Sequence, residues 1–218
     1  MVRNLLIAAL LLGCGRSPLA GGDDDDQGVC GDERFAVDVV EYDPAFSDGP
    51  LPSRAQFTDP YEALGEPDYA EGSDGAGHGA VSLGGGGLLW VSFGSCFVSN
   101  SGDRDADIRV YEVGVNVEST SIALVPTEAT ALRLSDTAIA GQGGGIFVGD
   151  IEGSTREVDI DAELAGFAAG ELTFVSLVMV DQLSQGWTNS EWAGADIDAV
   201  ELLAPRATKD RSSSSGTD

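Results

Sequence analysis

The strongest indicator of the fold is the segment TFVSLVMV at residues 173–180, the longest apolar and β-branched run that follows the N-terminal segment. Residues of this kind are enriched in β-strands. A strand with one face in water would alternate between apolar and polar side chains, and this segment alternates only weakly. We therefore expect a central strand whose two faces are both largely covered.

Shorter runs of the same kind lie on both sides of this segment, between turn signals, and 30 glycines in the chain suit tight turns. All the expected strands are residues 35–42, 79–83, 88–93, 108–113, 121–125, 131–134, 146–148, 157–161, 173–181 and 197–203. Their spacing predicts an all-β, jelly-roll-like β-sandwich. The best helical signal is at residues 161–167, where Asp161 would cap about two turns.

We expect one folded domain between two polar ends. Of the 218 residues, 42% are hydrophobic, which suits a single core. The expected parts are a signal peptide at 1–13, an acidic flexible tether at 14–31, the β-sandwich domain at 32–205 and a disordered tail at 206–218.

The N-terminus has the order of an export signal, with Arg3, an apolar run at 5–12 and then Gly13 and Cys14. The run is too short to span a bilayer. LLGC at 11–14 resembles the lipobox of bacterial lipoproteins, which implies that Cys14 carries the lipid. The resemblance, with no Asp directly after Cys14, points to the outer membrane. An ordinary cleaved signal with a chance cysteine is the alternative.

Acidic residues outnumber basic ones by 37 to 11, and the formal net charge is −26. This field would repel phosphate backbones, so we expect no nucleic-acid partner. Either solubility in a saline or extracellular setting or the binding of divalent cations explains the acidity.

Three cysteines are present, and assigning Cys14 to lipid leaves Cys30 and Cys96. In an oxidising compartment these two could form a disulfide. The alternative is two separately buried thiols, which are common for cysteine.

Four segments, in this order, are ALGEPD at 63–68, VSLGGGG at 81–87, DIRVYEVG at 107–114 and GADIDAV at 194–200. Together they resemble a family of bacterial cell-surface proteins, many of them lipoproteins, whose jelly-roll domain is akin to galactose-binding-like modules. The resemblance implies a surface-associated, non-enzymatic domain. Relatives usually carry a Ser-x-Asp-Gly-x-x-Trp hairpin where this chain has VPTEAT at 125–130, so a function tied to that hairpin does not carry over.

Related jelly-roll modules hold a structural calcium where an early loop meets the terminal strand. By position, the resemblance implies Glu66, Asp68 and Glu201 as ligands here. Alternation along the last strand would place Asp196 and Asp198 on one face and Glu201 on the other. Loop-fixing hydrogen bonds are the alternative role for these aspartates.

A second acidic segment places Asp103, Asp105 and Asp107 at alternate positions. In an extended loop their carboxylates would project to one side, where they could converge on a hard cation, for which calcium is the expectation. The alternative is a solvated turn.

Two tryptophans, Trp187 and Trp192, lie among polar residues in GWTNSEW at 186–192. This mixture suits stacking on a sugar ring, or the tryptophans could simply close one end of the core. Trp90, within an apolar strand, is expected in the core. The one histidine, His78, lies in a glycine-rich loop with no second residue to orient it.

No sequence motif for nucleophilic catalysis or phosphate binding is found, so we expect that this protein is not an enzyme. Three hypotheses remain. The first is a calcium-stabilised binding module for a glycan or envelope polymer. The second is a structural or adhesive envelope protein with no small-molecule site. The third is a hydrolase with paired carboxylates.

Overall fold

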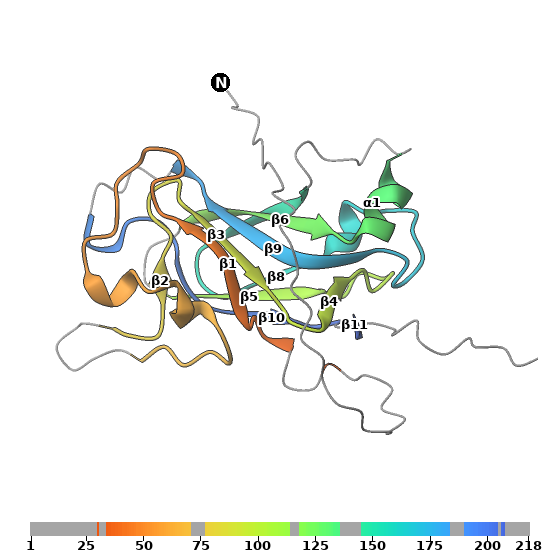
Figure 1. Ribbon diagram of the computed structural model, residues 1–218, viewed down its shortest axis with the longest axis horizontal. Helices are drawn as coiled ribbons and strands as arrows, with labels where there is room; N and C mark the ends of the chain where they lie inside the picture. The colour runs from red at the N-terminus through yellow and green to blue at the C-terminus, as the bar shows by residue number, and fades with distance from the viewer. Residues whose placement is uncertain are drawn as a thin grey trace, which may run out of the picture.

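The computed structural model describes Cys30 and residues 34–70, 77–113, 118–135, 145–183, 190–204 and 206–207. Within these ranges strands predominate, and they form two antiparallel sheets joined by one short helix and several 3-10 turns. Figure 1 shows the two sheets as layers that run along the long axis of the molecule. The expected all-β sandwich is confirmed.

The larger sheet is built around β9 (Thr173–Asp181). Leu177 of β9 pairs with Val91 on one edge and with Leu124 on the other, so β9 lies between β3 and β6. The other pairs of this sheet are β1 (Asp38–Asp43) with β3 (Leu88–Ser92), β4 (Cys96–Ser99) with β9 and with β11 (Arg206–Ala207), and β6 (Ser119–Pro126) with β7 (Ile146–Glu152).

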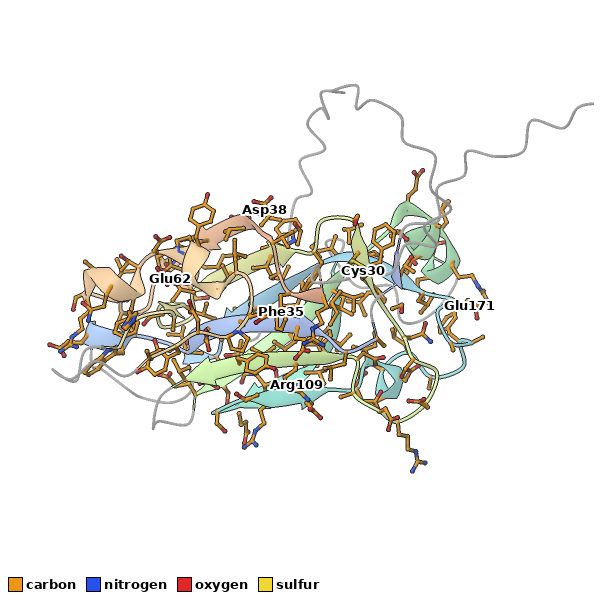
Figure 2. The ribbon with its side chains drawn as sticks, turned by 90° about the horizontal axis from the view of Figure 1, so that it is seen from below. Cys30, Phe35, Asp38, Glu62, Arg109 and Glu171 are labelled. Carbon is orange, nitrogen blue, oxygen red and sulfur yellow. A yellow bond between two sulfur atoms is a disulfide. The ribbon has the colours of Figure 1, made fainter. Side chains whose placement is uncertain are left out.

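The smaller sheet has the order β2-β10-β5-β8. Its strands are β2 (Val81–Ser82), β10 (Asp196–Leu202), β5 (Ile108–Val113) and β8 (Arg156–Val158). In Figure 2, Asp38 of β1 and Arg109 of β5 lie on opposite sides of the molecule, one on each sheet.

The core lies between the sheets. Leu177 and Met179 of β9 belong to the same buried cluster as Ile108 and Val110 of β5. Phe174 and Val178 are also fully buried, and only Val175 among the residues of β9 is exposed. The expected central strand with two covered faces is therefore confirmed.

The sandwich has two ends that differ in their loops. At the end we call the glycine-loop end, β5 and β9 finish, β10 begins, and the turn at 83–87 connects β2 to β3. At the helix end, the opposite one, lie α1 (Glu128–Leu134) and the loops at 100–107 and 159–172. The glycine-loop end is to the left in Figure 1 and α1 is to the right.

The expected strand at 131–134 is wrong, because these residues belong to α1. The Thr127 hydroxyl caps this helix by accepting a hydrogen bond from the backbone N–H of Thr130 at 3.2 Å. Thr130 and Leu134, four residues apart, are buried, while Leu132 between them is 69% exposed. That burial follows the period of a helix, not that of a strand.

The expected helix at 161–167 is also wrong. The structure has a single 3-10 turn, η5 (Ile160–Ala162), and its cap is Asp159 instead of Asp161. Further 3-10 turns are η2 (Ala55–Phe57), η3 (Pro60–Ala63) and η7 (Ser190–Trp192).

Two short strands were not expected from the sequence. β4 lies beyond the turn that follows β3, and β11 lies inside the segment 206–218 that was expected to be a tail. Each is too short to show a periodic pattern, and each is a strand because it pairs with a neighbour. No helix among the described residues has the length and apolar character needed to cross a membrane.

Cys30 and Cys96 form a disulfide, with their Cα atoms 5.7 Å apart. The bond ties a residue of the expected tether to β4, so the chain is fastened to the sandwich eight positions before the first strand begins. Both cysteines are buried.

Replacing both Cys30 and Cys96 by serine should lower the free energy of unfolding by about 4 kcal/mol, because the 66-residue separation leaves a long loop unconstrained in the unfolded chain. Urea unfolding of the wild type and the double variant measures the difference. Equal midpoints in non-reducing buffer would show that the bond contributes nothing.

Candidate functional site

Glu66, Asp68 and Glu201 are not gathered into one set of metal ligands. Glu66 and Asp68 are exposed, whereas Glu201 is buried. The Glu201 carboxylate pairs with Arg34 at 3.3 Å and Arg109 at 3.1 Å. Its charge is therefore neutralised on the smaller sheet by arginines.

The expected alternation along the last strand is interrupted, because the register of β10 against β5 shifts within 197–199. Asp198 Oδ1 accepts hydrogen bonds from the backbone N–H groups of Asp68 at 3.0 Å and Tyr69 at 3.3 Å. Asp198 thus fixes the loop before β2, which is the alternative role considered for it. Asp196 is hydrogen-bonded elsewhere and belongs to a different group of carboxylates.

Asp103, Asp105 and Asp107 do not project to a common side. Asp103 and Asp105 are exposed, and Asp103 accepts a hydrogen bond from the backbone N–H of Asp105 at 2.8 Å. Asp107 is buried. The loop consists of bends and is not extended, so the period-two argument does not apply to it.

Asp107 instead lies at the helix end with Asp159 and Asp161, and oxygens of these three carboxylates lie within 4.8 Å of one another. Among the described residues this is the group that could hold a metal ion by that spacing. All three carboxylates already accept hydrogen bonds. The donors are backbone N–H groups of Ser101, Gly102, Ile160 and Asp161 and the side chains of Asn100 and Ser101. Through these hydrogen bonds, the three carboxylates hold the loop at 100–107 against the loop at 159–172.

A second group of carboxylates, which we call the interior acid group, lies at the glycine-loop end and consists of Glu112, Glu118, Asp181 and Asp196. Glu112 is buried in phase with Ile108 and Val110, so its side chain points from β5 toward the core. Asp181 is in phase with Leu177 and Met179 of β9, and it therefore points inward from the facing sheet.

Glu118 directly precedes β6, and Thr120 of β6 pairs with Asp181. Paired residues on neighbouring strands share a face, so the Thr120 side chain points inward beside Asp181. Asp196 begins β10 and accepts a hydrogen bond from the Ser82 hydroxyl. The carboxyl pKa values of Glu118, Asp181 and Asp196 are raised. Thr120 lies beside Asp181, and Ser82 lies beside Asp196.

Glu112 and Thr120 carry oxygen atoms that are buried and have no hydrogen-bond partner. These atoms are Oε1 and Oε2 of Glu112 and Oγ1 of Thr120, and no other buried side-chain nitrogen or oxygen in the described part of the chain is left without one. Glu112 is 3% exposed and Thr120 is fully buried. Leaving such groups unsatisfied costs about 1–3 kcal/mol each, and more if the group is charged.

Burial raises the carboxyl pKa values throughout the interior acid group. The pKa of Glu112 rises to about 8, first through burial and then through the negative charges of Asp196 and Asp181, while Arg156 opposes the rise. Burial and the same neighbours raise the pKa of Glu118 to about 8.

The pKa of Asp196 rises to about 6 through burial, although the bond from Ser82 opposes this. The pKa of Asp181 is also raised by burial. The Tyr42 hydroxyl, which is buried near Asp196, has its pKa raised to about 12. Ionisation of these groups is therefore disfavoured at this end of the core.

Asp181 connects the interior acid group to the loops above it. Its Oδ1 accepts a hydrogen bond from the Gly86 backbone N–H at 2.6 Å, and its Oδ2 accepts one from Ala195 at 3.2 Å. Gly84 and Ala193 also hydrogen-bond through their backbones at 2.7 Å. The conformation of the loops is thus coupled to the position of the Asp181 carboxylate.

Of the interior acid group, only Asp196 was a sequence-based candidate. Glu112 could have been found, since the run IRVYEV at 108–113 places a carboxylate in phase with two apolar core positions. Glu118 and Asp181 have no such signal, because each lies at the end of a strand.

The aromatic candidate Trp192 lies at the glycine-loop end and is partly buried. The Arg54 guanidinium lies over its ring, 4.4 Å from the centroid, and pairs with Glu191 at 3.4 Å. Trp187 and Cys14 lie outside the described residues. Trp90 is partly buried in β3 and donates a hydrogen bond from Nε1 to the Ser176 hydroxyl at 2.6 Å.

His78 pairs through its backbone with Ala70 and belongs to no metal-ligand group among the residues that the structure describes. Comparison with known protein families, curated proteins and solved structures finds no match for this chain.

The raised carboxyl pKa values predict a pH-dependent stability. The pKa values of Glu112 and Glu118 are about 8 in the folded chain and near the ordinary value of 4.5 in the unfolded chain. Their contribution to stability is therefore present below about pH 4.5 and is lost as pH rises through about 8. In metal-free buffer, Glu112→Gln should raise the melting temperature at pH 8 by roughly 3 °C or more, and should change it little at pH 4.5.

Glu41→Gln, an exposed change on β1, is the control for charge alone. Differential scanning calorimetry at the two pH values measures both variants. A Glu112→Gln effect of equal size at both pH values would contradict the assignment of a buried, raised-pKa carboxyl.

Proposed function

We propose that this chain is a non-enzymatic bacterial cell-surface lipoprotein whose calcium-stabilised β-sandwich is a binding module for a glycan or envelope polymer. The observation that carries the binding proposal is the arrangement of Trp192, Arg54 and Glu191 at the glycine-loop end. An aromatic ring beside a fixed donor and a fixed acceptor suits a ligand with apolar faces and hydroxyl edges.

Further apolar side chains around these loops extend the surface available to a ligand. Leu51 and Leu183 are 50% and 54% exposed. Leu183 lies against the backbone positions of Gly49 and Gly86, so the loop at 44–51, the turn at 83–87 and the end of β9 meet here. Such grouping of exposed apolar residues favours recognition over a purely solvated surface.

Net charge limits the chemistry of the ligand. At −26 the chain repels polyanions, so we propose a neutral or amino-bearing polysaccharide as the ligand. The alternative, a structural or adhesive envelope protein with no small-molecule site, differs in needing no Trp192-dependent recognition.

Replacing Trp192 by alanine should weaken binding to such a polysaccharide by roughly tenfold or more, because the ring face and its flanking groups are lost. Phe147→Ala is a matched control, since Phe147 is 51% exposed on β7. A glycan array with neutral and amino-sugar polymers measures both variants. Loss of signal in both variants, or no signal with the wild type, would favour the structural alternative.

The membrane part of the proposal rests on the sequence LLGC at 11–14. Expression in bacteria with radiolabelled palmitate should label the wild type, and Cys14→Ser should abolish the label while the sandwich still folds. Labelling that persists in Cys14→Ser would overturn the lipid assignment, and so would its absence in the wild type.

A further inference from the structure

The interior acid group brings four carboxyl groups into the core, and the protein around it offers the Glu112 oxygens no hydrogen-bond donor. Four carboxylates act on one another, and Arg156 is the cation whose field opposes the pKa rise of Glu112. Buried charges in proteins are paired, coordinate a metal ion or lose their charge by protonation. Ion pairing is insufficient for these four carboxylates, so metal coordination and protonation remain.

Protonation by itself does not account for Glu112. A neutral carboxyl has an O–H donor that must be satisfied as well, and both Glu112 oxygens lack any partner. The Thr120 hydroxyl, from the facing sheet, is unpartnered too. Asp181 acts electrostatically on Glu112 and is the strand partner of Thr120, so the three unpartnered oxygens belong to one neighbourhood of carboxylates. They indicate that a ligand is shared between the two sheets.

The donor atoms decide the class of that ligand. The group offers carboxylate and hydroxyl oxygens and contains no histidine and no cysteine. All-oxygen sites suit hard cations, and calcium accepts irregular sets of six to eight oxygens, whereas magnesium usually keeps several waters.

We propose that Glu112, Glu118, Thr120 and Asp181, with Asp196 beside them, form an internal calcium site between the two sheets at the glycine-loop end. The oxygens of this group do not all lie within 4.8 Å of one another, as those of the Asp107 group do, so the proposal includes a movement of side chains when the ion binds. Asp181 can serve while keeping its two backbone bonds, since each carboxylate oxygen has two lone pairs.

This site gives a location to the calcium of the proposed function. It rests on the proposed function only for the identity of the ion. Because Asp181 also holds Gly86 and Ala195, the ion would stabilise the loops that carry Trp192. Calcium binding and polymer binding remain separate measurements.

The test is isothermal titration of CaCl2 into the full chain, stripped with chelator, at pH 8. The wild type should bind one calcium per chain, and Glu112→Gln should weaken binding at least about tenfold, although it raises the melting temperature of the metal-free chain. These opposite effects separate a ligand from a residue that only supports the fold. Thr120→Val, nearly equal in shape, should also weaken binding and serves if Glu112→Gln does not fold.

Three controls define the remaining outcomes. Glu41→Gln and Asp161→Asn should bind as the wild type does, and so should Trp192→Ala, even if polymer binding is lost. Binding that survives Glu112→Gln but fails in Asp161→Asn would move the calcium to the Asp107 group and overturn the proposal. No calcium binding by the wild type, or equal binding by all variants, would overturn it as well.

Discussion

The structure depends on β9 having hydrogen-bonded neighbours along both of its edges. With β3 and β4 on one side and β6 on the other, six of the nine residues of β9 are buried. Its inward side chains, Leu177 and Met179, belong to the hydrophobic core. Since a β-strand repeats every two residues, the same geometry directs Asp181 inward at the last position.

The inward direction of Asp181 makes the two ends of the sandwich physically different. At the helix end, carboxylates of the Asp107 group are satisfied by backbone N–H groups, which stabilises their charge and fixes the loops. At the glycine-loop end, Asp181 and Asp196 accept hydrogen bonds, but the two oxygens of Glu112 have no donor. The first arrangement is sufficient for loop structure, whereas the second leaves buried oxygens unsatisfied.

Local signals in the sequence were reliable where a single strand or turn decides the outcome. The run at 108–113 is a strand with the expected bounds, and the segment at 173–180 is central as expected. They failed at 131–134, where a threonine cap and four-residue spacing favour a helix, and at 103–107, where the loop is bent. Asp196 was identified from its own strand, but its partners Glu118 and Asp181 could not be, because they come from the facing sheet.

The sequence by itself determined the all-β class and the central segment, because composition and the period-two pattern express local preference and solvent exclusion. It left a Cys30–Cys96 disulfide and two separate buried thiols as alternatives, between which the structure decided. Only the tertiary structure decided which carboxylates meet. Asp181 lies about 70 positions from Glu112 in the chain, and their approach depends on how the sheets stack and where the strands end. Charges interact through space, so a site made from four strand ends leaves no contiguous pattern in the sequence.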